Sequence, residues 1–410
     1  MIKILQNPPP PGRNRKETGA EDAVRPIIDA VRREGDAALR RYARQLDGLG
    51  DQPLRLTEKE LAEAASAMPV AVREAAEIAI RNIRQFAAAQ LPKERFEEFS
   101  PGRKLGWIVR PLDAVGCYVP SGRYPLPSTL LMTAVFAQTA GVPRIAVTSP
   151  KPSLEILGCA HLLGIGEFYR VGGAQAIAAM ALGTAAIPRV DRIVGPGNAY
   201  VAAAKKLLAG EVGIDFLAGP TEILILAAAG GAKTIAADML AQAEHDPSAS
   251  ATFVTTSMAL AQAVAQEIER QLETLPTAQI ARQSIEHASA IVVMDDMDEA
   301  VAYANEAAPE HLSLHDASLL AKIRNAGTVF LGANSPESAG DYASGPSHVL
   351  PTGGAARLRG GLSTADFVKV IAVQSLTPAA LSELAPAITA LARAEGLEAH
   401  ARAVEVRCGG

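Results

Sequence analysis

The spacing of apolar residues along the chain changes near Trp107 and again after Gly361. From about residue 20 to residue 95, apolar residues recur every three or four positions among charged ones, which predicts amphipathic helices. Beyond Trp107, short apolar runs alternate with alanine-rich stretches, as strands and helices do in α/β proteins. The sequence therefore predicts a helical N-terminal part followed by a longer α/β part.

The strand–helix alternation runs through the chain twice. The first pass predicts strands at 115–119, 145–148, 167–171 and 192–194, with helices at 127–140, 154–163 and 174–182. The second pass predicts strands at 222–226, 251–255, 290–293 and 328–331, with helices at 233–244, 259–272 and 297–304. This order implies parallel sheets covered by helices on both faces, so we expect two doubly wound, Rossmann-like units.

The two ends of the chain differ from this pattern. Pro8 to Pro11 disfavour a helix and predict an extended N-terminal arm. After Gly361, a strand at 368–373 leads into a helix at 378–395, a segment too small to fold alone. It must pack on its own chain or on a neighbouring one. We expect an arm at 1–20, a first Rossmann-like domain of 21–117 with 222–362, a second of 118–221, and a C-terminal tail domain of 363–410.

Composition excludes several classes of function. A net charge of −5 and an aromatic content of 4% offer neither a basic surface nor stacking platforms for nucleic acid. The N-terminus has no signal-peptide core, and no apolar run of about 18 residues predicts a membrane span. Cys117, Cys159 and Cys408 are scattered without metal-type spacing, which indicates reduced thiols, the first two in the core. We expect a cytoplasmic protein of two or more domains.

Two short stretches concentrate ionisable groups against this alanine-rich background. Residues 308–312 contain the neighbours Glu310 and His311, and residues 338–348 contain Asp341 and His348. Proline and glycine predict that both stretches form loops outside regular helix, where catalytic groups are commonly presented. A histidine beside a carboxylate can transfer protons near neutral pH, so the pair predicts an enzyme. For His348 we favour packing or a loop hydrogen bond over catalysis.

Candidate metal ligands are spread along the chain. Gln242 and His245 are three residues apart, and Pro247 would end their helix with His245 in its last turn. Each candidate also has a structural explanation. His245 could be a histidine that the helix dipole favours at a helix C-terminus, and Asp341 could be a turn former. His400 could be an exposed or capping residue. A mixed set of nitrogen and oxygen donors suits Zn²⁺, although the spacing alone is weak evidence.

Two glycine-containing turns could contact an anion. Residues 172–175 (Gly-Gly-Ala-Gln) and 195–198 (Gly-Pro-Gly-Asn) each follow a predicted strand and open a predicted helix. Such turns can expose backbone N–H groups and a positive helix end to a phosphate. Neither is the full dinucleotide fingerprint G-x-G-x-x-G, so these turns alone are weak evidence for a nucleotide site.

Eight longer motifs occur in one order over about residues 20–405: GCYVPSGRYPLPSTLLM, VGGAQAIAAMALGT, DRIVGPGNAYV, AGPTE, AQAEHD, APEHL, SPESAGDYASGPSHVLPT and EGLEAH. This order resembles the histidinol dehydrogenase family. The resemblance implies oxidation of L-histidinol to L-histidine through an aldehyde, with two NAD⁺ reduced and one Zn²⁺ bound per site. It also implies a homodimer in which tail segments are exchanged between the subunits.

The resemblance also assigns roles to residues. It implies the acid–base pair Glu310 and His311, and the zinc ligands Gln242, His245, Asp341 and His400. It implies NAD contacts by Tyr118, Gln175 and Asn198. It implies substrate contacts by Thr221, Gln242, His245, His311, Asp341, Glu395 and His400, with Glu395 and His400 coming from the partner subunit. The family stretch usually reads A-G-P-S-E, and Thr221 keeps the hydroxyl of that serine while adding a methyl group.

Three alternatives remain open at the level of sequence. A related zinc- and NAD-dependent dehydrogenase could act on another small alcohol, such as a sulfonated diol. A zinc hydrolase could use Glu310 and His311 only to activate water, and would then form product without reducing a nicotinamide. A metal-binding scaffold without activity would leave that pair unexplained.

Overall fold

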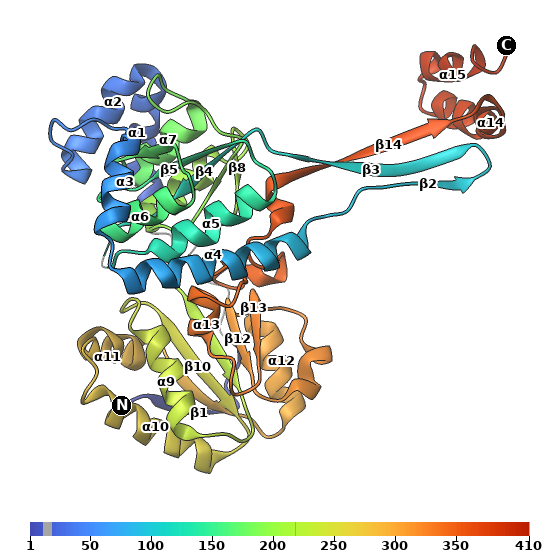
Figure 1. The fold of residues 1–410 in the computed structure, drawn as a ribbon. Helices are drawn as coiled ribbons and strands as arrows, with labels where there is room; N and C mark the ends of the chain where they lie inside the picture. The colour runs from blue at the N-terminus through green and yellow to red at the C-terminus, as the bar shows by residue number, and fades with distance from the viewer. Residues whose placement is uncertain (11–18, 123, 218, 410) are drawn as a thin grey trace. The chain divides into compact units, whose positions relative to one another are not determined.

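The computed structural model describes residues 1–10, 19–122, 124–217 and 219–409. Within them the chain forms two compact units, one of residues 1–90 with 113–367 and one of residues 91–112 with 368–410. The first unit contains two parallel sheets with their helices, and the second contains an antiparallel sheet and two helices (Figure 1). The predicted α/β class with two parallel sheets is confirmed.

The larger sheet has six strands in the order β1-β11-β10-β9-β12-β13, and every neighbouring pair is parallel. The strands are β1 (Lys3–Gln6), β9 (Glu222–Leu226), β10 (Ser250–Thr255), β11 (Ala290–Val293), β12 (His311–Leu314) and β13 (Thr328–Leu331). Helices α9 (Ala232–Ala243), α10 (Met258–Leu272), α11 (Ala278–His287) and α12 (Met297–Ala307) connect them. Apolar side chains of α9, α10 and α11 pack on the sheet in one core, and α12 contributes to a second core.

The smaller sheet has five parallel strands in the order β6-β5-β4-β7-β8. These are β4 (Ala114–Tyr118), β5 (Arg144–Thr148), β6 (Glu167–Tyr169), β7 (Arg192–Val194) and β8 (Gly213–Ile214). Its helices are α5 (Pro127–Thr139), α6 (Leu154–Leu162), α7 (Gly173–Leu182) and α8 (Ala199–Leu208). The strand order reverses direction between β4 and β7, the kind of position where open α/β sheets bind ligands.

The N-terminal helices pack on the smaller sheet, which differs from the predicted grouping of residues 21–117 with 222–362. They are α1 (Ala20–Glu34), α2 (Asp36–Tyr42), the π-helical turn η1 (Ala43–Asp47), α3 (Glu58–Ala67) and α4 (Val70–Gln90). Helix α1 packs against α7 and α8, α3 against α6, and α4 against α5. The physical reason is a shared core, in which Val24, Ile28 and Val31 of α1 join buried side chains from β4 to α8.

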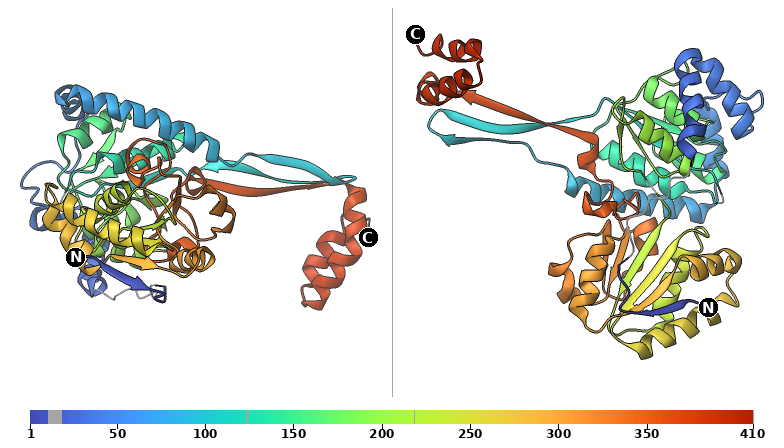
Figure 2. Two further views of the ribbon diagram at one scale, coloured as in Figure 1. Left: turned by 90° about the horizontal axis from the view of Figure 1, so that it is seen from below. Right: turned by 180° about the vertical axis from the view of Figure 1, so that it is seen from behind.

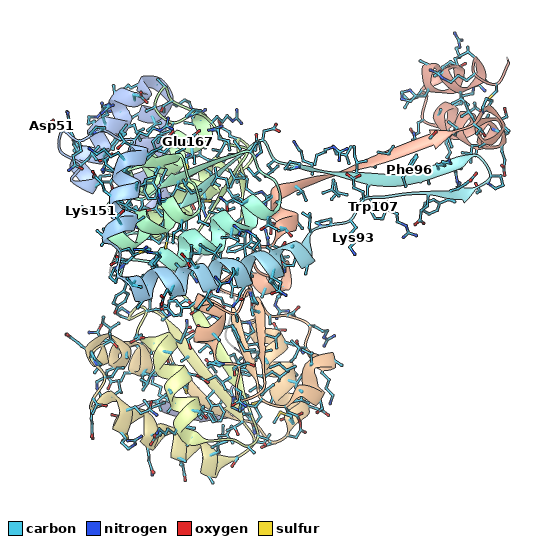
Figure 3. All side chains as sticks on the ribbon, in the orientation of Figure 1. Asp51, Lys93, Phe96, Trp107, Lys151 and Glu167 are labelled. Carbon is cyan, nitrogen blue, oxygen red and sulfur yellow. The ribbon has the colours of Figure 1, made fainter. Side chains whose placement is uncertain are left out.

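The second unit is a ribbon of three antiparallel strands that leads to a pair of helices (Figure 2). Strand β14 (Val368–Leu376) pairs with β3 (Arg103–Pro111), which pairs with β2 (Arg95–Ser100). Helices α14 (Pro378–Ala394) and α15 (Glu398–Glu405) pack on each other. The predicted tail of 363–410 was therefore too short, because β14 needs the hairpin that carries Phe96 and Trp107 (Figure 3).

Three local predictions need correction. Part of the predicted arm is strand β1, which pairs with β11, while residues 11–18 lie outside the described residues. The two stretches predicted as loops contain strand β12, which starts at His311, and helix α13 (Glu337–Tyr342). Helix α9 ends at Ala243, so His245 follows the helix instead of occupying its last turn. Short 3₁₀ turns complete the unit: η2 (Ala317–Lys322), η3 (Ala355–Arg357) and η4 (Thr364–Phe367).

The buried positions agree with the expected character of the cysteines. Cys117 and Cys159 are buried and Cys408 is exposed, all three as free thiols. Burial raises the pKa of Cys117 to about 12, which keeps this thiol protonated and unreactive at neutral pH. Among the described helices, none has the length and apolar content to cross a membrane.

Candidate active site

The Glu310–His311 pair lies where strands β9 and β12 begin. His311 is the first residue of β12 and is in register with Ile223 of β9 and Thr328 of β13. Because the strands are parallel, their amino ends meet at one edge of the sheet, which also receives the carboxyl end of the returning helix α9. That edge therefore gathers Thr221 before β9, Gln242 at the end of α9, and the Glu310–His311 pair before and at the start of β12.

A directed chain of hydrogen bonds connects three of the predicted site residues. Gln242 Nε2 donates to Thr221 Oγ1 at 2.8 Å, and Thr221 Oγ1 donates to Glu310 Oε2 at 2.6 Å. The backbone N–H of Glu222 donates to the same Glu310 oxygen at 2.9 Å. Since a carboxylate only accepts, the Thr221 proton must point to Glu310 and the amide nitrogen of Gln242 must point to Thr221. The buried Gln242 Oε1 is thereby left without a hydrogen-bond partner among the described residues.

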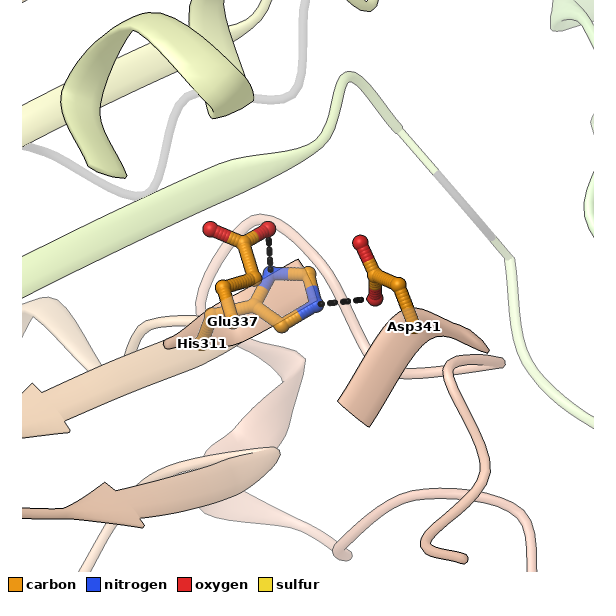
Figure 4. Close-up of side chains that lie close together, drawn as sticks. All are labelled: His311, Glu337 and Asp341. Carbon is orange, nitrogen blue, oxygen red and sulfur yellow. Dashed lines mark ion pairs between the residues drawn. The ribbon is translucent and has the colours of Figure 1, made fainter. Parts of the chain in front are cut away.

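His311 is held in one orientation by its surroundings. Its Nδ1 lies 3.1 Å from the carbonyl oxygen of Glu222, which can only accept, so Nδ1 carries a proton. Its ring stacks on Phe330 with 5.9 Å between the ring centres. Nε2 has no hydrogen-bond partner in the described part of the chain and faces Asp341 Oδ1 at 3.7 Å (Figure 4). When the ring is neutral, this proton stays on Nδ1 and Nε2 presents an unshared electron pair, as a base requires.

Glu337 belongs to the same cluster, although the sequence analysis did not select it. Its Oε1 lies 3.3 Å from His311 Nδ1 (Figure 4), and its side chain is 3% exposed. Neither of its carboxylate oxygens has a hydrogen-bond partner among the residues described. His311, Glu337 and Asp341 together bring three possible metal-ligating atoms within 4.8 Å of one another. Glu337 is four residues before Asp341, shares helix α13 with it and lies in the motif SPESAGDYASGPSHVLPT, and these are the sequence signals that could have identified it.

The pKa values in the cluster reflect burial and an excess of carboxylates. Burial raises the pKa of Glu310 and of Glu337, and the positive charge of His311 only partly offsets this. Burial alone would lower the pKa of His311, but the carboxylates of Glu337, Glu310 and Asp341 raise it well above its ordinary value. For Asp341, burial favours a higher pKa, but interaction with His311, and to a smaller extent with His348 and His245, lowers it.

These groups fit a divalent cation. The buried carboxyl groups of Glu310 and Glu337 and the half-buried one of Asp341 surround one imidazole, so protonation of His311 can balance only one negative charge when all three are ionised. Burying the remaining charges is unfavourable unless a cation compensates them. Gln242 Oε1, whose side chain is joined to Glu310 through Thr221, and the Asp341 carboxylate are available oxygen donors, and the charge of His245 contributes to lowering the pKa of Asp341. Oxygen and imidazole donors of this kind suit Zn²⁺.

Four other histidine and glutamate residues that the sequence analysis considered lie outside the hydrogen-bond chain of Gln242, Thr221 and Glu310. The side chain of His245 is exposed, just beyond α9. His348 Nδ1 lies 3.0 Å from the Asp341 carbonyl oxygen and Nε2 lies 3.3 Å from Thr129 Oγ1, so a loop hydrogen bond, as predicted, is present. Burial lowers the pKa of His348, which keeps its ring neutral. Glu395, at the end of α14, and His400, in α15, have exposed side chains in the second unit.

The predicted NAD contacts lie at the carboxyl edge of the smaller sheet. Tyr118 ends β4, Gln175 is in the first turn of α7, and Asn198 precedes α8. The Gly195 turn after β7 approaches β4 so closely that a side chain at Gly195 would lie 2.2 Å from the Tyr118 carbonyl oxygen. With a φ of +113°, this position also requires glycine. Tyr118 and the Gly195 turn therefore flank the point where the strand order reverses.

Both glycine turns follow a strand and open a helix, as predicted, but the N–H groups of Gly172, Gly173 and Gly195 are already used. Gly172 N donates to Asp47 and Gly173 N to the Tyr118 hydroxyl, at 3.0 and 3.1 Å. Gly195 N donates to Asp215, which also forms a buried ion pair with Lys205 at 2.7 Å. The Asn198 side chain caps α8 by accepting from the N–H groups of the second and third helical residues, Tyr200 and Val201. These donors are thus satisfied internally.

Comparison with known proteins identifies the family. The model of the histidinol dehydrogenase family matches residues 12–408. The chain belongs to the histidinol dehydrogenase family. Histidinol dehydrogenases from Geobacillus kaustophilus and Thermus thermophilus are each 48% identical to it, over 404 and 392 residues, and the matches cover 95% and 94% of each chain. A crystal structure of histidinol dehydrogenase from Elizabethkingia anophelis superposes with a TM-score of 0.94 at 36% identity, covering 99% of this chain and 98% of that one.

Proposed function

We propose that this member of the histidinol dehydrogenase family oxidises L-histidinol to L-histidine through histidinaldehyde, with two NAD⁺ and one Zn²⁺ per site, as the last steps of histidine biosynthesis. The observation that carries the proposal is the buried His311 ring, whose Nε2 is unpartnered among the described residues while Nδ1 is fixed by the Glu222 carbonyl. When bound, Zn²⁺ would hold the amine and an imidazole nitrogen of the substrate, and NAD⁺ would accept hydride.

His311 acts as the base in the first oxidation. Its Nε2 takes the proton of the substrate hydroxyl, while the carbon-bound hydrogen leaves as hydride to the first NAD⁺ and the alcohol becomes an aldehyde. The charge that forms on the ring is close to the carboxylates of Glu337 and Asp341, at 3.3 and 3.7 Å. Positioning of the alcohol beside both base and hydride acceptor supplies much of the rate enhancement.

Glu310 acts in the second oxidation. Its carboxylate takes a proton from water as the water oxygen bonds to the aldehyde carbon. The His311 ring returns the proton it holds to the carbonyl oxygen, which gives the hydrate and leaves the ring neutral. His311 then takes a hydroxyl proton of the hydrate as the second hydride passes to a second NAD⁺ and the carboxylate forms. Thr221 orients Glu310 through its 2.6 Å hydrogen bond, which supports the assignment of that carboxylate as a fixed base.

Gln242, His245, Asp341 and the partner's His400 would hold the zinc ion. Thr221, Gln242, His245, His311 and Asp341 would contact the substrate together with the partner's Glu395. Tyr118, Gln175 and Asn198 would contact NAD. This assignment requires exchange of the second unit within a homodimer. The exposed side chains of Glu395 and His400 in the single chain support that exchange, because both are available to a partner subunit.

The 48% identity to two histidinol dehydrogenases favours histidinol over another small alcohol such as a sulfonated diol. A hydrolase that uses Glu310 and His311 for water activation alone would form product without reducing NAD⁺, so the absorbance of NADH would not appear. The test is purified protein with histidinol and NAD⁺, followed by absorbance and by product analysis. Two NADH per histidine formed, abolished by a chelator and restored by Zn²⁺, would support the proposal. Product without NADH would refute it.

Exchange of the second unit has its own test. Chains carrying His400→Ala and chains carrying His311→Asn are each expected to be inactive alone. Mixed under conditions that exchange subunits, they should recover activity, because one of the two sites in a mixed dimer would contain both histidines. Absence of recovery, when mass spectrometry confirms mixed dimers, would contradict shared sites.

A further inference from the structure

Asp47 lies in the N-terminal helical part, outside every motif that the family resemblance selected. It ends the π-helical turn η1, and its side chain is buried at 7% exposure. Its Oδ2 accepts a hydrogen bond from Gly172 N and another from Gln175 Nε2, both at 3.0 Å. A π-helical turn inside or after an α-helix is frequently found at functional sites. Asp47 therefore connects the N-terminal helices to the turn that opens α7.

The carboxylate of Asp47 determines which way the Gln175 amide faces. Because a carboxylate only accepts, the NH₂ group of Gln175 must point to Asp47 and Oε1 must point away from it. Gln175 is 0% exposed, and Oε1 has no hydrogen-bond partner in the part of the chain described. An unpartnered acceptor at this depth is unfavourable unless a ligand supplies a donor.

The neighbouring Gly173 lies close to this buried oxygen and has no side chain that would collide with it. Gly173 has a φ of +59°, and a Cβ atom at this position would lie 2.8 Å from Gln175 Oε1. The N–H groups of Gly172 and Gly173 are already taken by Asp47 and the Tyr118 hydroxyl. A phosphate would need free backbone N–H donors at this turn, and those of Gly172 and Gly173 are not free. The turn offers an acceptor instead, the Oε1 atom of Gln175.

We propose that Asp47 is a positioning residue of the dinucleotide site, which fixes Gln175 so that its Oε1 accepts a hydrogen bond from a donor group of NAD⁺, an amino group or a ribose hydroxyl, and not from a phosphate. The inference rests on the proposed function, since it takes NAD⁺ as the ligand. It goes beyond that function by assigning Asp47 and by stating the chemistry of the group that Gln175 binds.

The first experiment measures NAD⁺ binding by calorimetry without histidinol, together with KM for NAD⁺ and kcat. Gln175→Ala should weaken binding roughly 10-fold, the usual effect of losing one buried hydrogen bond. Asp47→Ala should weaken it similarly, and the double variant should bind no more weakly than either single one, because Asp47 acts through Gln175. Asp47→Asn, which retains an oxygen acceptor, should recover part of the loss. In the Asp47 variants the loss should appear in KM for NAD⁺ and not in kcat at saturating NAD⁺. The zinc content of all these variants should stay near that of the parent.

A matched control separates positioning from general stability. Asp36 also connects the N-terminal helices to the smaller-sheet part of the chain, because its Oδ1 accepts from Ala186 N at 3.1 Å. Ala186 follows the C-terminal end of α7, away from the turn that opens this helix. Asp36→Ala should lower the unfolding temperature without changing NAD⁺ affinity. Equal losses of affinity in Asp36→Ala and Asp47→Ala, or additive losses in the Asp47→Ala/Gln175→Ala variant, would overturn the proposal. If Asp47→Ala does not fold, unchanged affinity in both Asp47→Asn and Gln175→Ala would overturn it.

Two NAD⁺ analogues distinguish the possible donors. The hypoxanthine analogue lacks the adenine amino group, and the acetylpyridine analogue lacks the carboxamide NH₂. If one of these NH₂ groups donates to Gln175, the analogue that lacks it should bind the parent and Gln175→Ala with equal affinity. If both analogues still bind the parent more tightly than Gln175→Ala, the donor is a ribose hydroxyl. Failure of the parent to reduce NAD⁺ with histidinol would refute the proposed function. If the parent turns over but Gln175→Ala binds NAD⁺ with the parent's affinity, only this inference is refuted.

Discussion

Replacing Thr221 by valine tests whether its hydroxyl is the link that orients both Gln242 and Glu310. Valine has nearly the shape of threonine, so the change removes two hydrogen bonds without opening a cavity. Gln242 Nε2, in a side chain that is 0% exposed, would lose its acceptor, and Glu310 would keep only the bond from Glu222 N. Leaving one buried donor unsatisfied costs about 1–3 kcal/mol, and weakening a bond to a charged group adds a comparable amount. We expect Thr221→Val to be destabilised by roughly 2–4 kcal/mol.

The same substitution should also weaken metal binding. Without Thr221 the Gln242 amide is free to turn, and loss of a residue that orients a ligand typically lowers metal affinity about 10–100-fold. The assay is a zinc competition titration with a chromophoric chelator, together with thermal unfolding. Thr221→Ser, which retains the hydroxyl, is the control and should stay close to the parent in both. Parent-like zinc affinity in a folded Thr221→Val protein would refute the orienting role of Thr221.

Three further predictions follow from the cluster and from one surface contact. Glu310→Gln should slow aldehyde oxidation by about 100-fold or more and alcohol oxidation much less, whereas His311→Asn should slow both; equal aldehyde rates in Glu310→Gln and the parent would contradict the water-activating role. Burial raises the pKa of Glu337 to about 8, so its ionisation opposes folding increasingly as pH rises from 4.5 to about 8. Glu337→Gln should therefore stabilise the metal-free protein by about 1–3 kcal/mol at pH 8 but not at pH 4.5, as measured by denaturant unfolding with chelator present; no gain at pH 8 would argue against a strained carboxylate. The Thr57 backbone N–H, with other hydrogen bonds, lowers the pKa of Glu60 to about 2, so the stability that Glu60 contributes is present above pH 4.5 and lost as pH falls through about 2. Because Glu60 is partly exposed, Glu60→Gln should lose only about 1 kcal/mol at neutral pH, with the difference disappearing near pH 2; a difference that persists there would rule out this cause.

The sequence was informative wherever apolar patterning and turn residues act locally. Strand β9 was predicted with its observed bounds, and helix α7 within one residue, because buried strands and alanine-rich helices have a clear period. The hairpin of β2 and β3 was missed because its residues are mostly exposed or half-buried and lack a buried alternating face. Strand β12 was missed because Pro309 and the charged pair obscure a run of only four residues.

The sequence indicated which residue types to expect in the candidate site, but not the contacts between them. The motifs selected Thr221, Gln242 and Glu310 separately, yet the hydrogen-bond chain joining them depends on the register of β9 with β12, which a sequence does not display. Glu337 was missed for the same reason, since its importance comes from the His311 ring beside it. Asp47 lies 125 residues before Gly172, and only the packing of the N-terminal helices on the smaller sheet brings the two together.

The most direct test of this account is the position of zinc in crystals of the zinc-loaded enzyme, located by anomalous scattering. Gln242 Oε1, His245 nitrogen, Asp341 oxygen and the partner's His400 nitrogen are each expected at about 2.0–2.2 Å from one ion. The Gln242 amide nitrogen should remain on Thr221, with His311 outside the coordination sphere. An ion bound by His311 Nε2 and Glu337, with Gln242 uncoordinated, would contradict the account, because the proposed base would then be a ligand.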